Sequence, residues 1–147
     1  MITKPFVCVL LALCAFEASA ATPACVTVEQ GWVRLTPAMM RMAAGFARIR
    51  NGCANEVVVI GAGSKAFGDV SLHETTVVQG VSRMREIERL PIAAGASAEL
   101  KPGGLHLMLM QPEVALAEGA QLPLRLSLED GTKVDGMLQV RREAPTR

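Results

Sequence analysis

The segment Leu105-His106-Leu107-Met108-Leu109-Met110 places a leucine at every second position. Side chains on a β-strand point to opposite faces in turn, with a period of two residues. The three leucines therefore share one face, which suits a hydrophobic core, while the histidine and the two methionines share the other. This pattern predicts a strand on which an imidazole and a thioether, two residues apart on one face, can both reach a single metal ion.

The remainder of the chain also shows the pattern of short strands, and no stretch has a sustained apolar period of 3.6 residues. Strands are expected at 25–35 (as one strand or two, broken near Gly31), 44–50, 56–62, 69–78, 81–87, 122–128 and 134–140, with 90–100 leading into an edge strand. We expect 56–62 to be buried on both faces or nearly so. Turn sequences such as Asn51-Gly52 and Asp130-Gly131 separate these segments. Together they predict an all-β, antiparallel Greek-key sandwich.

Residues 1–20 have the features of a secretory signal peptide. Lys4 supplies the positive charge, 6–15 form a short apolar run, and Ala18-Ser19-Ala20 is a small-residue cleavage site. A buried N-terminal helix is the alternative interpretation. A lipoprotein signal is disfavoured because Leu13 is bulky for the position before a lipidated Cys14. We therefore expect an exported protein, located in a bacterial periplasm.

The mature chain, 21–147, is expected to be a single domain with its core at 25–140 and a short charged tail at 141–147. The formal net charge of the whole chain is +1 and its charges are scattered, so there is no basic patch for nucleic acid. No apolar run after the signal peptide approaches the length of a membrane span, and no membrane insertion is expected. We expect a monomer.

Signal cleavage would leave two cysteines, Cys25 and Cys53. In an oxidising compartment such a pair favours a disulfide. The bond would close a loop of 28 residues and stabilise the fold by roughly 3–4 kcal/mol through chain entropy. The alternative interpretation is a pair of thiolate ligands for a metal ion.

Four side chains stand out as candidate metal ligands: His73, Met84, His106 and Met108. Each alone has an ordinary interpretation, because strand histidines are often surface residues and methionines often fill gaps in a core. Both histidines of the chain, however, lie on expected strands that carry or face a methionine. Two imidazoles and two thioethers form a neutral, soft set that suits Cu(I) better than Zn²⁺, Mg²⁺ or Ca²⁺. The imidazoles must be neutral to bind, so affinity should fall below about pH 6.

Other kinds of site fit the sequence less well. A blue-copper centre needs a cysteine thiolate beside two histidines, and no cysteine lies near either histidine in the sequence. Catalytic zinc needs three firm ligands, and Glu74 should point away from His73 on a regular strand. No catalytic triad order, phosphate-binding glycine loop or Cys-x-x-Cys pair is present. We therefore expect no enzymatic activity.

The spacing of the four residues resembles that of the periplasmic copper chaperones of the PCu(A)C family. Ten residues separate His73 from Met84, twenty-one separate Met84 from His106, and one separates His106 from Met108. Segments 71–74, 80–85 and 100–110 are also similar, and the resemblance extends over 26–140. Unlike many members, this chain has Glu74 rather than methionine after the first histidine. Its tail at 141–147 also lacks the histidines and methionines that form a second copper site in some members.

The resemblance implies a cupredoxin-like β-sandwich that binds one Cu(I) through His73, Met84, His106 and Met108. It implies delivery of copper towards the binuclear centre of cytochrome c oxidase subunit II, often together with a Sco-type protein. We expect the copper to be transferred by ligand exchange. Three alternatives remain: a copper-buffering or resistance protein, a copper redox protein, and an exported scaffold in which these residues are incidental. Met39, Met40, Met42 and Met110 could form a soft path for incoming metal, or serve packing and surface roles.

Overall fold

The computed structural model describes residues 24–146, and these form ten β-strands with no helix. The strands are β1 (Val26–Arg34), β2 (Met42–Asn51), β3 (Val57–Gly63), β4 (Phe67–Val78), β5 (Val81–Glu86), β6 (Leu90–Ile92), β7 (Ser97–Leu100), β8 (Leu105–Pro112), β9 (Gln121–Leu128) and β10 (Lys133–Arg141). The predicted all-β class is therefore confirmed. The predicted signal peptide, residues 1–20, lies outside the described residues.

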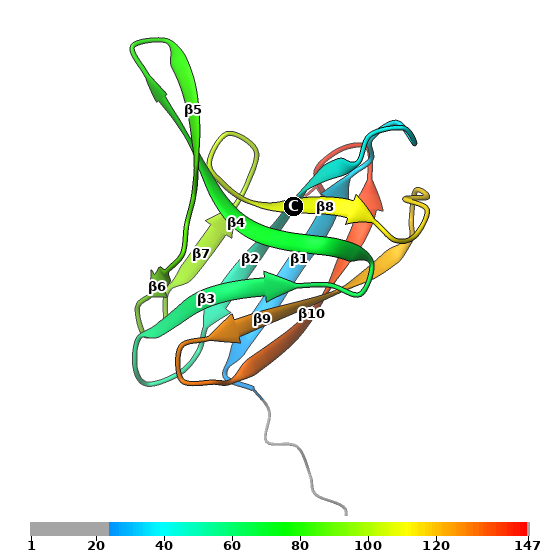
Figure 1. Ribbon diagram of the computed structural model, residues 1–147. Coiled ribbons are helices and arrows are strands. Elements are labelled where there is room, and N and C mark those ends of the chain that lie inside the picture. Colours follow the sequence, from blue (N-terminus) through cyan, green and yellow to red (C-terminus); the bar gives the residue numbers. More distant parts are fainter. Residues whose placement is uncertain (1–23, 147) are drawn as a thin grey trace, which may run out of the picture.

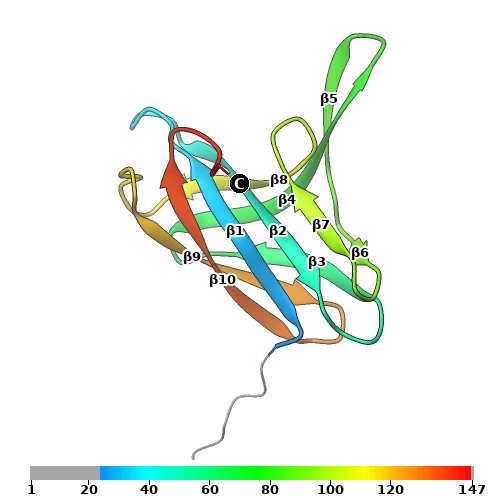
Figure 2. The ribbon, with the colours of Figure 1, turned by 180° about the vertical axis from the view of Figure 1, so that it is seen from behind.

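The strands form one continuous sheet in the order β5-β4-β8-β7-β2-β1-β10-β9-β3-β6. This sheet curls over, so that β3 and β4 lie on one side of the molecule (Figure 1) while β1, β2 and β10 lie on the other (Figure 2). Most neighbours are antiparallel, as predicted. The pairs β1–β10 and β7–β8 are parallel, a feature that the sequence pattern did not predict. No helix in the described residues is long and apolar enough to cross a membrane.

The core lies between the two sides of the curled sheet and consists mainly of aliphatic residues. The predicted alternation in β8 is confirmed, because Leu107 and Leu109 are fully buried. Leu124, Leu126 and Leu128 of β9 also point inward, as predicted. The inward-facing leucines therefore fix which face of β8 is left for His106 and Met108.

One strand prediction needs correction, and one alternative is resolved. β3 is not buried on both faces: Val59 is fully buried, but Ile60, on the opposite face, is 45% exposed. For 25–35, where the sequence allowed one strand or two, the structure has one: β1 continues through a bulge between Glu29 and Trp32. Gly31 is required there, because a Cβ at this position would lie 2.1 Å from the carbonyl oxygen of Met137 in β10.

Candidate metal centre

The strands β4 and β8 bring the two histidines of the chain together. In their antiparallel ladder His73 lies directly opposite His106, and Ser71 lies opposite Met108. The ring centroids of the two histidines are 5.9 Å apart, with 32° between the ring planes. Because paired residues in a ladder point to the same face, His73, His106 and Met108 all project from the outer face of the sheet.

Met84 reaches this face from the edge strand β5. It pairs with Thr75 of β4, while His73 pairs with Glu86 two residues further along β5. Met84 is therefore a diagonal neighbour of His73 on the same face, a separation that a long side chain can span. The side chain is 53% exposed, and all six residues of β5 are exposed. Figure 1 shows β5 and the end of β4 as an arm that projects from the sandwich.

Hydrogen bonds leave one ring nitrogen of each histidine free. His106 is 7% exposed, and its Nδ1 lies 3.0 Å from the carbonyl oxygen of Gly104. Since a carbonyl can only accept, Nδ1 carries the proton and Nε2 keeps its lone pair. In His73 the Nε2 lies 3.0 Å from Ser71 Oγ, while Nδ1 is buried without a partner. With Nε2–H donating to Ser71, the Nδ1 lone pair is available to a metal ion.

Sequence reasoning missed the two groups that orient these imidazoles, Ser71 and the carbonyl of Gly104. Each lies two residues before the histidine that it contacts. Ser71 and His73 share a strand face because they are two residues apart, so the sequence did contain a signal for this contact. Metal-bound histidines usually donate their second ring nitrogen to an oxygen in this way, which fixes the ring orientation.

Carboxylates do not complete a hard metal site here. The Glu74 carboxylate accepts a hydrogen bond from the Arg85 guanidinium at 2.7 Å, away from the histidine face. No group of three or more His, Cys, Asp or Glu side chains in residues 24–146 could hold a metal ion. Glu86, the register partner of His73, shares this face, but it belongs to no such group, so the candidate donors closest to the paired histidines are the thioethers of Met84 and Met108. Imidazoles and thioethers are neutral and favour a soft monovalent ion over Zn²⁺ or Ca²⁺.

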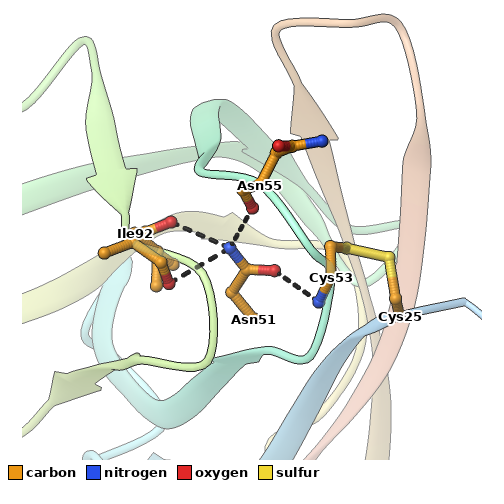
Figure 3. The surroundings of a disulfide bond; sticks show 6 residues. Cys25, Asn51, Cys53, Asn55 and Ile92 are labelled. Carbon is orange, nitrogen blue, oxygen red and sulfur yellow. Dashed lines mark hydrogen bonds between the residues drawn. A yellow bond between two sulfur atoms is a disulfide. The ribbon is translucent and has the colours of Figure 1, made fainter.

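The cysteines do not contribute to the site. Cys25 and Cys53 are joined in a disulfide, with their Cα atoms 5.0 Å apart. This confirms the predicted bond and excludes the alternative of a thiolate metal pair. Figure 3 shows the bond beside Asn51, a fully buried residue at the end of β2 whose side chain connects several backbone groups.

Two ion pairs and one set of hydrogen bonds elsewhere on the surface lower the pKa of three carboxyl groups. The Arg89 guanidinium donates to Glu129 and lowers the pKa of that carboxyl, and Arg125 acts in the same way on Asp135. Backbone and side-chain hydrogen bonds from Thr132 lower the pKa of Asp130. All three groups are exposed, so these shifts concern surface stability rather than the chemistry of the candidate site.

Comparisons with known proteins add family and fold information. The model of the LpqE-like family matches residues 26–140. The chain is 35% identical over 108 residues to Lxx21020 of Leifsonia xyli subsp. xyli, a protein whose name describes a lipoprotein; the match covers 73% of this chain and 64% of Lxx21020. The chain thus spans less than two thirds of the length of this relative.

Two solved structures have a similar fold. The apo PCuAC domain from PmoF1 matches with a TM-score of 0.66 and 20% identity, over 83% of this chain and 96% of that domain. The solution structure of CuI-DR1885 from Deinococcus radiodurans matches with a TM-score of 0.65 and 25% identity, over 89% of this chain and 87% of that protein.

Proposed function

Because this chain belongs to the LpqE-like family and shares the fold of PCuAC domains, we propose that it is an exported Cu(I) metallochaperone. DR1885, one of its structural neighbours, has been solved with Cu(I) bound. In this proposal copper is the cargo of the protein, and the protein catalyses no reaction.

The proposed ligands are His73, Met84, His106 and Met108. The observation that carries this assignment is the direct pairing of His73 with His106, each with one ring nitrogen that makes no hydrogen bond, on the face that also holds Met108. Met84 supplies the fourth donor from the arm. Because these ligands are neutral, the loaded site carries only the single charge of Cu(I). Its thioethers favour Cu(I) over harder ions.

Ligand exchange is the proposed mechanism of transfer. Met84 is exposed and lies at the edge of the sheet, so donor atoms of a recipient can approach the metal from that side. His106, by contrast, is buried and fixed by Gly104. The recipient would replace the outer ligands first and the buried imidazole last. Thioethers and imidazoles of moderate strength suit release better than a cage of thiolates would.

An anaerobic titration of Cu(I) against a coloured Cu(I) chelator tests the ligand set. The protein should begin at Ala21, so that Cys8 and Cys14 contribute no thiolates. We expect one tight equivalent, which is lost in the Met84→Ala, Met108→Ala double variant and kept in Met137→Ala. Met137 is a suitable control because it is an exposed methionine on β10. Failure of the wild type to compete, or equal binding by the double variant, would refute the assignment.

We propose the periplasm as the location and cytochrome c oxidase subunit II, together with a Sco-type protein, as the destination of the copper. The support for this destination is the resemblance of segments 71–74, 80–85 and 100–110 to the PCu(A)C chaperones. A deletion strain complemented with the wild type or with the double variant tests it. A delivery protein predicts loss of oxidase activity under copper limitation. If the strain instead fails only under copper excess, the protein buffers copper and has no oxidase recipient.

A further inference from the structure

A second group of methionines lies on the same outer face as the candidate copper site. Met42 of β2 lies directly opposite Met110 of β8, and Met110 lies opposite Asp69 of β4. The inward neighbours Ala43 and Leu109 are buried in the core, so Met42 and Met110 point outward. Two thioethers and a carboxylate thus form one row across three adjacent strands.

The local hydrogen bonding brings the two thioethers close together. The backbone N–H of Gln111 donates to the carbonyl oxygen of Arg41 at 2.8 Å, one position beyond the methionine pair. Met42 and Met110 are therefore a non-hydrogen-bonded pair of the antiparallel ladder. In such pairs the Cα atoms are only about 4.5 Å apart and the side chains are closest. Two flexible methionine side chains at this separation can direct both sulfur atoms at one ion.

The same pair is open to solvent. Met42 is 41% exposed and Met110 is half-buried, so neither is committed to the core. Asp69, on the far side of Met110, is also exposed and supplies a negative charge beside the two neutral sulfur atoms. A monovalent cation is therefore favoured over an anion or a purely apolar ligand.

Met108 lies between this row and the histidines. It is two residues from Met110 and two from His106 on β8, which is roughly 7 Å in each direction along a strand. Its register partners in β2 and β4 are Ala44 and Ser71, whose small side chains leave the thioether accessible. Soft donors therefore follow one another along the outer face of β8, from Met110 through Met108 to His106.

The structure divides the methionine cluster that the sequence suggested as a path for metal. Met40 lines a surface depression of about 390 Å³ that also includes Pro112 and Leu116, and Met39 is 89% exposed in the loop before β2. Met42 is the one methionine of the cluster at 39–42 that pairs with a methionine of β8, namely Met110.

We propose that Met42 and Met110 form a second soft-metal site, which takes a monovalent ion such as Cu(I) or Ag(I). With two thioethers and no imidazole, it binds more weakly than the four-ligand site. Its position makes it a receiving site from which Met108 accepts the ion. Binding at Met42 and Met110 stands on its own, whereas the receiving role rests on the proposed copper-carrier function.

The test is a titration with Ag(I), a redox-stable soft ion, followed by NMR of protein that begins at Ala21 and carries ¹³C-labelled methionine methyl groups. The first equivalent should shift the signals of Met84 and Met108, and the second should shift those of Met42 and Met110. The Met42→Leu, Met110→Leu variant should lose the second equivalent and keep the first. Met137→Leu should lose neither.

The outcomes separate the two proposals. Signals of Met42 and Met110 that stay in place at excess Ag(I), or a second equivalent that persists in the double variant, would overturn the second site. If these signals shift but those of Met84 and Met108 never do, the second site stands and the four-ligand assignment of the proposed function fails instead.

Discussion

Replacement of Asn51 by alanine is expected to destabilise the protein more than most single substitutions. Asn51 is fully buried. Its Nδ2 group donates to the carbonyl oxygens of Asn55 and Ile92, each at 2.9 Å, and of Ala93 at 3.2 Å, and its Oδ1 accepts from the N–H of Cys53 at 2.9 Å. One side chain therefore connects the end of β2 with the segment after β6 and with the disulfide.

The magnitude follows from counting these bonds. An amide group has two N–H donors, so it satisfies two of the three carbonyl groups fully and shares a bond with the third. Three good hydrogen bonds, the one to the Cys53 N–H among them, at a net value of about 1 kcal/mol each give about 3 kcal/mol. The cavity left by the carboxamide adds about 1 kcal/mol. We expect a loss of about 4 kcal/mol, a large part of the 5–15 kcal/mol typical of a domain.

Guanidinium unfolding of the oxidised protein, followed by the fluorescence of its single tryptophan, Trp32, measures this loss. Asn55→Ala is the matched control, because Asn55 takes part through its backbone carbonyl and its side chain is exposed. The control should change stability by less than about 0.5 kcal/mol. A loss below about 1 kcal/mol in Asn51→Ala would show that the network does not hold these segments together.

Three further predictions concern a close backbone contact, an orienting hydroxyl and a surface ion pair. Gly31→Ala places a Cβ 2.1 Å from a main-chain oxygen that cannot rotate away. This variant should lower the free energy of unfolding by about 3 kcal/mol. Gly63→Ala, which has no atom within 4 Å of its added Cβ, should be tolerated in the same assay. Ser71→Ala removes the partner of His73 Nε2 and should weaken Cu(I) binding roughly 10–100-fold in chelator competition, whereas Ser127→Ala should not. The Glu129 carboxyl has a lower pKa in the folded state than in the unfolded state. Its carboxylate therefore stabilises the protein at pH values above the unfolded-state pKa. This stabilisation is lost as the pH falls through the folded-state pKa. Glu129→Gln should therefore flatten the acid side of a pH–stability profile, an effect that high salt should reduce; a profile that keeps its shape would contradict this assignment.

The sequence predicted which face of β8 points inward but not which strands lie beside it. Alternation is a local property, so the outward direction of His106 and Met108 followed from Leu107 and Leu109 alone. The pairing of His73 with His106 depends instead on the register of β4 against β8, two strands far apart in the chain. The likeness to the PCu(A)C pattern supplied a list of candidate ligands, and the ladder shows how three strands bring these side chains to one face.

Two other features could not be predicted because they depend on segments distant in the sequence. Asn51-Gly52 was interpreted as a simple turn, yet Asn51 is buried because the chain at 92–96 crosses over the end of β2. The run of β-branched residues in β3 suggested burial on both faces. Burial of a strand face requires a covering element, and among the described residues the side chain of Ile60 is covered only in part.

The arm formed by β5 and the end of β4 should open more often than the core of the sheet. β5 pairs only with β4 among the described strands, and none of its residues is buried, so its separation from β4 exposes no core. Such local opening costs less free energy than global unfolding. Amide hydrogens of β5 should therefore exchange with solvent faster than those of β8. A metal ion held by Met84 together with His73 would oppose this separation, so the occupancy of the site could be followed as slower exchange across the β4–β5 pair.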